Sequence, residues 1–379
     1  MRVGFLIDRW QPDRGGAERA MADLATWLEE RGHEPRAFAM LGTGAFDAVR
    51  APFALTRGRR ERALGHALVA AARKAGCDVT VGIRHLPRVD LYWPHAGSHA
   101  AALRGSQSAR EGRLLAPQEV RAGGRHRTFL EMERGLLEGG GARRIACVSN
   151  LVLRELAAAY PTAAERLVHV PNGVDTDRFH PREREGRGAQ LRRELEIDRA
   201  MPLLGFSARR PELKGLPTVF GALDGLQGRP WRLLVAGPSD VRAWEERARA
   251  SGLPPERIRV VAEVDPVALA SACDLLLHPT WRDACGLVVL EALAAGTPVV
   301  TTAQAGAAEV VTSEEHGIVV HDPGNVAALR SAIIDRLARI TSGSSDREQV
   351  RSAILGRDRA TWLSAIESIL LDLAARRVV

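Results

Sequence analysis

The sequence predicts an α/β protein made of two Rossmann-like parallel-sheet domains that face a cleft. The chain has 379 residues, and such a length suits two domains of about 100–200 residues better than one. Hydrophobic residues make up 45% of the sequence and charged residues 26%, which is typical of a folded protein and argues against disorder and coiled coil. Short apolar segments alternate with helical patterns along both halves, the order that produces parallel sheets.

The first half begins with a strand predicted at 2–7, a glycine-containing loop and an amphipathic helix at 17–30. Further strands are predicted at 34–39, 78–83, 90–93, 144–148 and 166–170, with helices at 61–75 and 151–160.

The second half repeats this pattern after 171–188, a stretch with Pro, Gly and many charges that we interpret as a linker. Strands are predicted at 203–207, 231–236, 258–262, 275–278, 298–301 and 318–320, with helices at 215–226, 241–251, 267–272, 286–295 and 326–341. We therefore expect an N-terminal domain over 1–178, a C-terminal domain over 179–360, and a C-terminal segment, 361–379, whose helix folds back toward the first domain.

Cysteines and charge narrow the class of protein. The four cysteines, at 77, 147, 273 and 285, form no C-x-x-C pair, so we expect reduced thiols and no metal site. A net charge of +7 favours polyanionic surroundings such as nucleic acid, anionic lipid or a phosphorylated substrate. No apolar run is long enough for a membrane span, and residues 3–7 are too short for a signal peptide, so we expect a cytoplasmic protein.

Two loops carry candidate groups for an anion. Gly15 and Gly16 precede a helix and offer backbone N–H groups at its positive end, although this spacing is equally typical of a plain turn. Arg209 and Lys214 follow the first strand of the second half, where two fixed cations would neutralise a phosphate leaving group. The alternative interpretation is that Arg209 and Lys214 are ordinary surface charges exposed to solvent. However, Lys74 and Lys214 are the only lysines among 53 basic residues, which favours a role for Lys214.

A third candidate site surrounds the helix predicted to begin near Gly286. Phosphate would be held there by the N–H groups of Cys285, Gly286, Leu287 and Val288. The carboxylates of Asp283 and Glu291 would accept hydrogen bonds from sugar hydroxyls. The alternative is that Asp283 caps the helix and Glu291 is an ordinary helical residue. The chain has neither G-x-G-x-x-G nor a P-loop, which argues against a dehydrogenase and an NTPase.

Five motifs together carry a resemblance: Gly15-Gly16-x-Glu18, Val148-Ser149-Asn150, the Asn-Gly-Val-Asp stretch at 171–179, Arg209-x4-Lys214-Gly215 and Asp283-x7-Glu291. In this order, from residue 1 to about residue 312, they resemble family 4 of the retaining glycosyltransferases, which have the GT-B fold. Residues 125–139 and 278–308 are most similar to the bacterial lipopolysaccharide core glucosyltransferase I group.

The resemblance implies a nucleotide-diphosphate sugar donor, expected to be UDP-glucose, with no cofactor, no metal and no protein nucleophile. It assigns the donor diphosphate to Gly15, Gly16, Arg209 and Lys214, and the ribose to Glu291. Asp283 would hold the transferred sugar with the Gly286 and Leu287 amides, beside Cys285 and Val288, while backbone near Val264 would contact the base. The family usually has Glu at the position of Asp283, which leaves the donor sugar open.

A histidine of the first domain should also approach the donor sugar. His95 is preferred because it lies nearest the end of the strand at 90–93, and His99 is the second choice. Their spacing also suits a metal pair, but the Gly between them and the lack of further ligands argue against zinc. Asp175-Thr176-Asp177 spells a D-x-D metal motif, which we interpret as part of the linker.

Basic residues concentrate at 50–74 and 104–127. They suit a glycan or glycolipid acceptor that carries phosphate, or an anionic membrane surface, so we expect peripheral association with the inner face of the cytoplasmic membrane. A uniformly arginine-rich surface is the simpler alternative. Nucleic-acid binding is disfavoured, because aromatic residues make up only 4% of the chain and no recognition motif is present. An epimerase, a phosphorylase or a non-catalytic sugar-nucleotide binder would keep the fold and change the chemistry.

Overall fold

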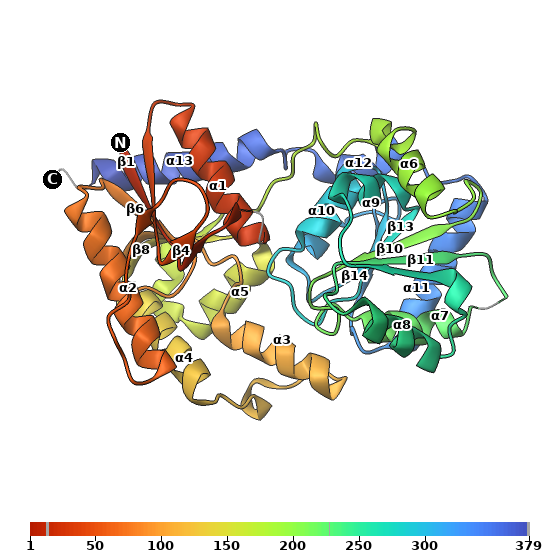
Figure 1. Cartoon of the computed structure of the whole chain (residues 1–379), viewed down its shortest axis with the longest axis horizontal. Coiled ribbons are helices and arrows are strands. Elements are labelled where there is room, and N and C mark those ends of the chain that lie inside the picture. The colour runs from red at the N-terminus through yellow and green to blue at the C-terminus, as the bar shows by residue number, and fades with distance from the viewer. Residues whose placement is uncertain (13–14, 227, 377–379) are drawn as a thin grey trace. The chain divides into compact units, whose positions relative to one another are not determined.

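The computed structural model describes residues 1–12, 15–226 and 228–376 (Figure 1). The chain divides into two compact units. Unit 1 comprises Met1–Leu103, Val120–Asn172 and Ala360–Val379, and unit 2 comprises Arg104–Glu119 and Gly173–Arg359. Residues 104–119 therefore belong to unit 2, although they precede the expected boundary at 178, and the C-terminal segment belongs to unit 1.

Unit 1 is built on a parallel sheet of seven strands in the order β5-β3-β1-β6-β7-β8-β9. The strands are β1 (Arg2–Leu6), β3 (Glu34–Ala39), β5 (Asp47–Ala48), β6 (Val79–Gly82), β7 (Val89–Tyr92), β8 (Ala142–Cys147) and β9 (Leu167–His169). Two short strands, β2 (Arg9–Trp10) and β4 (Leu41–Gly42), form a separate pair. Because β3 lies on one side of β1 and β6 on the other, the strand order reverses between β1 and β6. Ligands of such sheets bind at this topological switch point, beyond the carboxyl ends of the strands.

Helices surround the unit 1 sheet. They are α1 (Gly16–Glu29), α2 (Arg57–Lys74), the first turn of α3 (His99–Glu111), α4 (Gly124–Leu137), α5 (Asn150–Ala159) and α13 (Arg359–Ala375). The C-terminal helix α13 lies beside α1 (Figure 1), where Glu367 accepts a hydrogen bond of 2.8 Å from the Trp27 indole. The Arg143 guanidinium donates to the Leu373 carbonyl at 2.9 Å. These contacts join the C-terminal helix to unit 1, as the sequence predicts.

Unit 2 contains a parallel sheet of six strands in the order β12-β11-β10-β13-β14-β15. They are β10 (Leu203–Ser207), β11 (Arg232–Ala236), β12 (Ile258–Val261), β13 (Leu275–His278), β14 (Val299–Thr302) and β15 (Gly317–Val320). In order of appearance this is 3-2-1-4-5-6, the order of the Rossmann fold, with its switch point between β10 and β13.

Alternation along β10 explains the layers of unit 2. Leu204 and Phe206 face a core formed with α7 (Leu216–Asp224), α8 (Val241–Ala250) and α11 (Val326–Thr341). Leu203 points the other way, to a smaller core beneath α6 (Arg187–Glu194) and α9 (Pro266–Ala272). Buried strands with apolar residues on both faces are typical of a parallel sheet covered on both sides.

The remaining helices are α10 (Leu287–Ala294) and α12 (Arg347–Arg351). Short 3₁₀ turns lie at Pro117–Glu119, Pro161–Arg166, Pro181–Arg184, Pro255–Arg257, Gly306–Val310 and Ser352–Ile354.

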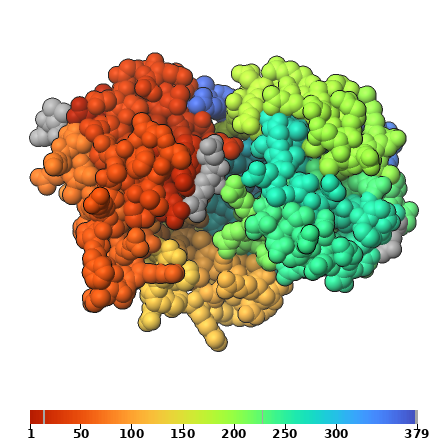
Figure 2. Space-filling model, viewed as in Figure 1, coloured from red at the N-terminus to blue at the C-terminus, as the bar shows by residue number. Residues whose placement is uncertain are grey.

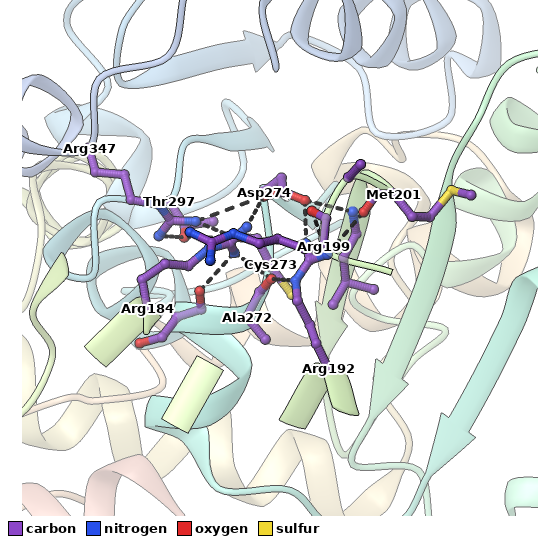
Figure 3. Close-up of polar contacts among 12 residues, drawn as sticks. Arg184, Arg192, Arg199, Met201, Ala272, Cys273, Asp274, Thr297 and Arg347 are labelled. Carbon is purple, nitrogen blue, oxygen red and sulfur yellow. Dashed lines mark hydrogen bonds and ion pairs between the residues drawn. The ribbon is translucent and has the colours of Figure 1, made fainter. Parts of the chain in front are cut away.

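Three arginines converge on Asp274, which follows the last turn of α9 (Figure 3). Arg184 and Arg192 bind its two carboxylate oxygens at 2.6 and 2.5 Å, and Arg347 lies 4.0 Å away. All three also donate to backbone carbonyls: Arg184 and Arg192 to that of Ala272, and Arg347 to that of Cys273. Carbonyls at a helix end lack helical partners and carry the negative end of the dipole, so this cluster closes the C-terminus of α9.

Several expectations are wrong in detail. Helices α3, α4, α6 and α12 were not predicted, and the expected linker at 171–188 contains a 3₁₀ turn and the start of α6. In α6 the only large apolar residue is Leu191, and Arg192 is buried instead through its contacts with Asp274, so the helix shows no apolar periodicity. All four cysteines are buried free thiols. Among the described residues, no helix is both long and apolar enough to cross a membrane.

Candidate functional site

Lys214, His278 and Asp283 meet at the switch point of the unit 2 sheet. Lys214 lies in the turn after β10, His278 is the last residue of β13, and Asp283 follows β13. The Lys214 ammonium is 2.5 Å from Oδ2 of Asp283, and His278 Nε2 is 3.1 Å from the same oxygen. Lys214 also donates to the Arg282 carbonyl at 3.3 Å. The three side chains form a connected charged group, hereafter the Lys-His-Asp cluster.

The charge state of this cluster follows from its contacts. Burial alone would raise the pKa of Asp283, but the positive charge of Lys214 and the His278 hydrogen bond hold that pKa well below its usual range. Burial lowers the pKa of His278. The imidazole is therefore neutral near neutral pH, and since a carboxylate only accepts hydrogen bonds, His278 donates through an Nε2–H group. Asp283 is thus ionised and held by two donors.

Two glycines fix the loops that carry the cluster. Gly215 has a φ of +82°, and a Cβ there would overlap the Pro279 carbonyl, so the turn after Lys214 packs directly on the segment after β13. Gly286 has a φ of +91° and is the N-cap of α10. Left-handed backbone is costly for other residues, which explains a glycine at each point.

The first turn of α10 presents backbone N–H groups beside the cluster. Gly286, Leu287 and Val288 begin this helix, where N–H groups have no acceptor one turn earlier within the helix. The alternative in which Asp283 caps the helix is wrong, because Gly286 is the N-cap and Asp283 binds Lys214 instead. Cys285 also differs from expectation. It is buried, and its N–H points to Oδ1 of Asp283 at 3.4 Å, because the Asp283 carboxylate reaches forward along the turn to the residue two positions later.

The other candidate residues of unit 2 are not part of the Lys-His-Asp cluster. Arg209 is exposed and forms no hydrogen bond or ion pair within the described ranges, so the expectation of two fixed cations holds for Lys214 alone. The exposed turn after β10 leaves Arg209 without a carboxylate, whereas Lys214 binds Asp283. Glu291 lies half-buried on α10, and Val264 packs against the smaller core.

Unit 1 carries its own candidates at the carboxyl edge of its sheet. Gly15 is the N-cap of α1 and Gly16 its first residue. His95 follows β7 and packs its ring 4.3 Å from the Trp93 ring. Burial lowers the pKa of His95 to about 3.

His99 instead belongs to a polar group at the start of α3. Its Nε2 lies 3.1 Å from Nδ1 of His126, and its backbone N–H donates to buried Glu133 at 2.7 Å. Asp175 accepts the N–H groups of Asp177 and Arg178 at 3.2 and 2.9 Å, so the carboxylate that begins the D-x-D motif stabilises a turn.

His278 is the cluster residue that sequence reasoning missed. Its place at the end of a predicted strand was a signal, because the carboxyl ends of parallel strands gather ligand-binding side chains. The pairing of Lys214 with Asp283 was also missed, since it depends on β10 and β13 being neighbours in the sheet.

Two family models match the chain, one over each half. Residues 14–178 match the model described as Glycosyltransferase Family 4, and residues 201–339 match the model described as Glycosyl transferases group 1.

Curated relatives agree with these matches. The lipopolysaccharide glucosyltransferase WaaG of Escherichia coli K12 is 27% identical over 331 residues, covering 85% of this chain and 86% of that protein. The D-inositol 3-phosphate glycosyltransferase of Xylanimonas cellulosilytica is 34% identical over 205 residues, about half of each chain at 50% and 49%.

Solved structures share the fold. A crystal structure of WaaG, described as a glycosyltransferase involved in lipopolysaccharide biosynthesis, superposes with a TM-score of 0.80 at 23% identity, covering 97% of this chain and 99% of that one. The Anabaena protein HepE in complex with UDP-glucose superposes with a TM-score of 0.72 at 18% identity, covering 98% and 100%.

Proposed function

Because this chain belongs to glycosyltransferase family 4 and has the GT-B fold, we propose that it transfers glucose from UDP-glucose to a hydroxyl group of a glycan or glycolipid, with retention of the anomeric configuration. Glycosyl transfer to glycans or glycolipids, without regard to the donor, follows from the family and from the relatives' names. The donor, the stereochemistry and the metal independence are the proposal.

The observation that carries the proposal is the Lys-His-Asp cluster beside the first turn of α10. Its ammonium and the N–H groups of Gly286, Leu287 and Val288, which have no acceptor within the helix, are suited to a diphosphate, because they supply positive charge and donors at one edge of the sheet. We assign Asp283 to hydroxyls of the transferred sugar and Glu291 to the ribose. Arg209, Gly15, Gly16 and His95 stay assigned to the donor as the resemblance implies.

The chemistry then needs no protein nucleophile. The bond between the sugar C1 and the diphosphate oxygen breaks, and a bond from C1 to the acceptor oxygen forms on the same face. The acceptor proton passes to the departing diphosphate. Negative charge grows on the phosphate during this step, and Lys214 with the α10 dipole stabilises it without a metal ion.

The acceptor proposal rests on relatives and charge. WaaG is named for lipopolysaccharide, and the Xylanimonas protein is named for an inositol phosphate, so we propose an envelope glycan or glycolipid as acceptor. The basic stretches at 50–74 and 104–127 support peripheral binding to an anionic membrane surface.

The test is a transfer assay with purified full-length protein and a lipopolysaccharide core fraction as acceptor. UDP-glucose, GDP-mannose and ADP-glucose are compared, each with and without EDTA, and the product anomer is read by NMR. We expect transfer from UDP-glucose alone, unchanged by EDTA, with an α-linked product. A β-linked product, or activity abolished by EDTA, would contradict the mechanism. Donor binding without transfer to this fraction or to other envelope glycans would favour a non-catalytic binder.

A further inference from the structure

Unit 1 has a pocket of about 370 Å³ whose walls are dominated by arginine. Five arginines line it against two carboxylates, Asp8 and Glu61. The arginines are Arg9, Arg57, Arg60, Arg84 and Arg125. We propose that this pocket holds a phosphate group carried by the acceptor sugar. The proposal deepens the proposed transferase function and rests on it.

The pocket lies at the switch point of the unit 1 sheet. Asp8 follows β1, Met40 follows β3 and Arg84 follows β6, so three neighbouring strands deliver residues to it. Arg84 binds Asp8 at 2.8 Å, across the point where the strand order reverses. Parallel sheets bind their ligands at this place. The pocket therefore occupies in unit 1 the position that the Lys-His-Asp cluster occupies in unit 2.

The two carboxylates are already neutralised. Arg84, which is 19% exposed, binds Asp8 at 2.8 Å and Glu61 at 2.7 Å. Arg125 reaches Glu61 only at 3.5 Å. One half-buried guanidinium thus satisfies both acidic groups, and the other arginines add positive charge that the pocket itself does not balance.

Arg9, Arg57 and Arg60 are the cations left over. Arg57 and Arg60 are exposed on the first turn of α2, a segment coloured orange-red on the face shown in Figure 2. In the part of the chain that the structure describes, neither has a carboxylate within ion-pair distance, and Arg60 contacts only the Met40 sulfur, at 3.8 Å. A Cβ at Gly58 would overlap the Thr128 hydroxyl of α4, so α2 is held close against the helix that carries Arg125.

The chemistry of the lining selects the ligand class. Guanidinium groups bind phosphate with paired hydrogen bonds, and a neutral sugar gives no reason to gather five of them. Among the described residues that line the pocket there is no aromatic side chain, which disfavours a stacked nucleobase. Small-molecule sites have volumes of about 300–1,000 Å³, so 370 Å³ suits a single phosphorylated sugar.

The test compares two variants of the full-length protein. Arg57→Gln/Arg60→Gln removes two of the three unpaired cations, and Arg59→Gln removes an exposed arginine of the same helix that does not line the pocket. Glucose 6-phosphate, glucose and inorganic phosphate are titrated by calorimetry, and UDP is titrated in parallel. We expect the wild type to bind glucose 6-phosphate and not glucose. The double variant should lose at least about tenfold in affinity, while Arg59→Gln and all UDP affinities stay within about twofold.

Other outcomes separate the possibilities. An equal loss in Arg59→Gln would overturn the pocket in favour of general charge attraction. If wild type binds vesicles of phosphatidylglycerol and phosphatidylcholine through Arg57 and Arg60 but does not bind the sugar phosphate, the site is a lipid headgroup site and the proposal is wrong. If the wild type does not bind UDP, the result counts against the proposed function. If it binds UDP but not the sugar phosphate, only the proposal of a phosphate site in this pocket is overturned.

Discussion

The ammonium nitrogen of Lys214 lies 2.5 Å from Oδ2 of Asp283, across 69 positions of sequence. The pair bridges the loops after β10 and β13, the two strands between which the order of the unit 2 sheet reverses. Arg84 and Asp8 bridge the corresponding strands of unit 1 at 2.8 Å. Each unit thus places an ion pair at its switch point, where a parallel sheet binds ligands.

Removal of the Lys214 charge should abolish most of the transfer activity. Lys214→Met takes away the cation that would meet the leaving diphosphate, and kcat/KM should fall by roughly 10²–10³-fold, as for other preorganised electrostatic groups. Lys74→Met is the matched control, because it removes the only other lysine, on the last turn of α2. An equal loss in both variants would contradict the role of Lys214.

His278 is predicted to act as a positioning residue through Asp283. His278→Phe removes the Nε2–H donor, and a hydrogen bond to a charged group contributes about 1.5–3 kcal/mol. We therefore expect kcat to fall by at least about tenfold with little change in KM for the donor. His278→Gln places an amide donor near the same position and should restore most of the rate. A purely structural role would instead lower stability and leave kcat of the folded protein unchanged.

Asp274 should be a major source of unit 2 stability. Asp274→Ala leaves buried Arg192, which binds it at 2.5 Å, without its carboxylate. Removal of one partner from a buried ion pair costs about 3–5 kcal/mol, and urea unfolding measures this loss. Arg199→Ala breaks the exposed pair with Glu185 and should leave the midpoint unchanged. A small effect of Asp274→Ala would show that the backbone carbonyls alone hold the arginines.

His95 should make stability depend on pH. Burial lowers its pKa to about 3 in the folded protein, whereas an unfolded histidine titrates near about 6.5. The unfolded chain therefore binds a proton that the folded chain does not, and stability falls as the pH drops below about 6.5 and toward about 3. Between about pH 7 and pH 5 the loss from this residue is at most about 2 kcal/mol.

The variant His95→Leu isolates this contribution. Urea unfolding near pH 7 measures how much the substitution changes the free energy of unfolding through packing. From pH 7 to pH 5 the stability of the His95→Leu variant should then decline less than that of the wild type. Parallel curves for the two proteins would contradict a His95 that stays neutral in the folded protein.

Much of the fold could be predicted from local patterns. The strands at 203–207 and 275–278 are mainly apolar segments that end in a polar residue, and the structure has them with the same bounds. The helices α4 and α6 were missed because their buried residues are few or charged, such as Glu133 and Arg192. Lys214 and Asp283 were both predicted as site residues. Their pairing, the part of His278 and the pocket around Arg84 were not, because each depends on which strands are neighbours in a sheet.

The donor site proposed for unit 2 is tested most directly by the thermal shift of the purified protein with UDP, GDP and ADP, each with and without magnesium. Ligand bound to the folded state raises the melting temperature in proportion to the logarithm of its concentration over Kd. A UDP-sugar site in unit 2 should give a shift with UDP that exceeds those with GDP and ADP, does not need magnesium, and is lost in Glu291→Ala. No shift with any nucleotide, or a shift that requires magnesium, would contradict a metal-independent UDP-sugar site in unit 2.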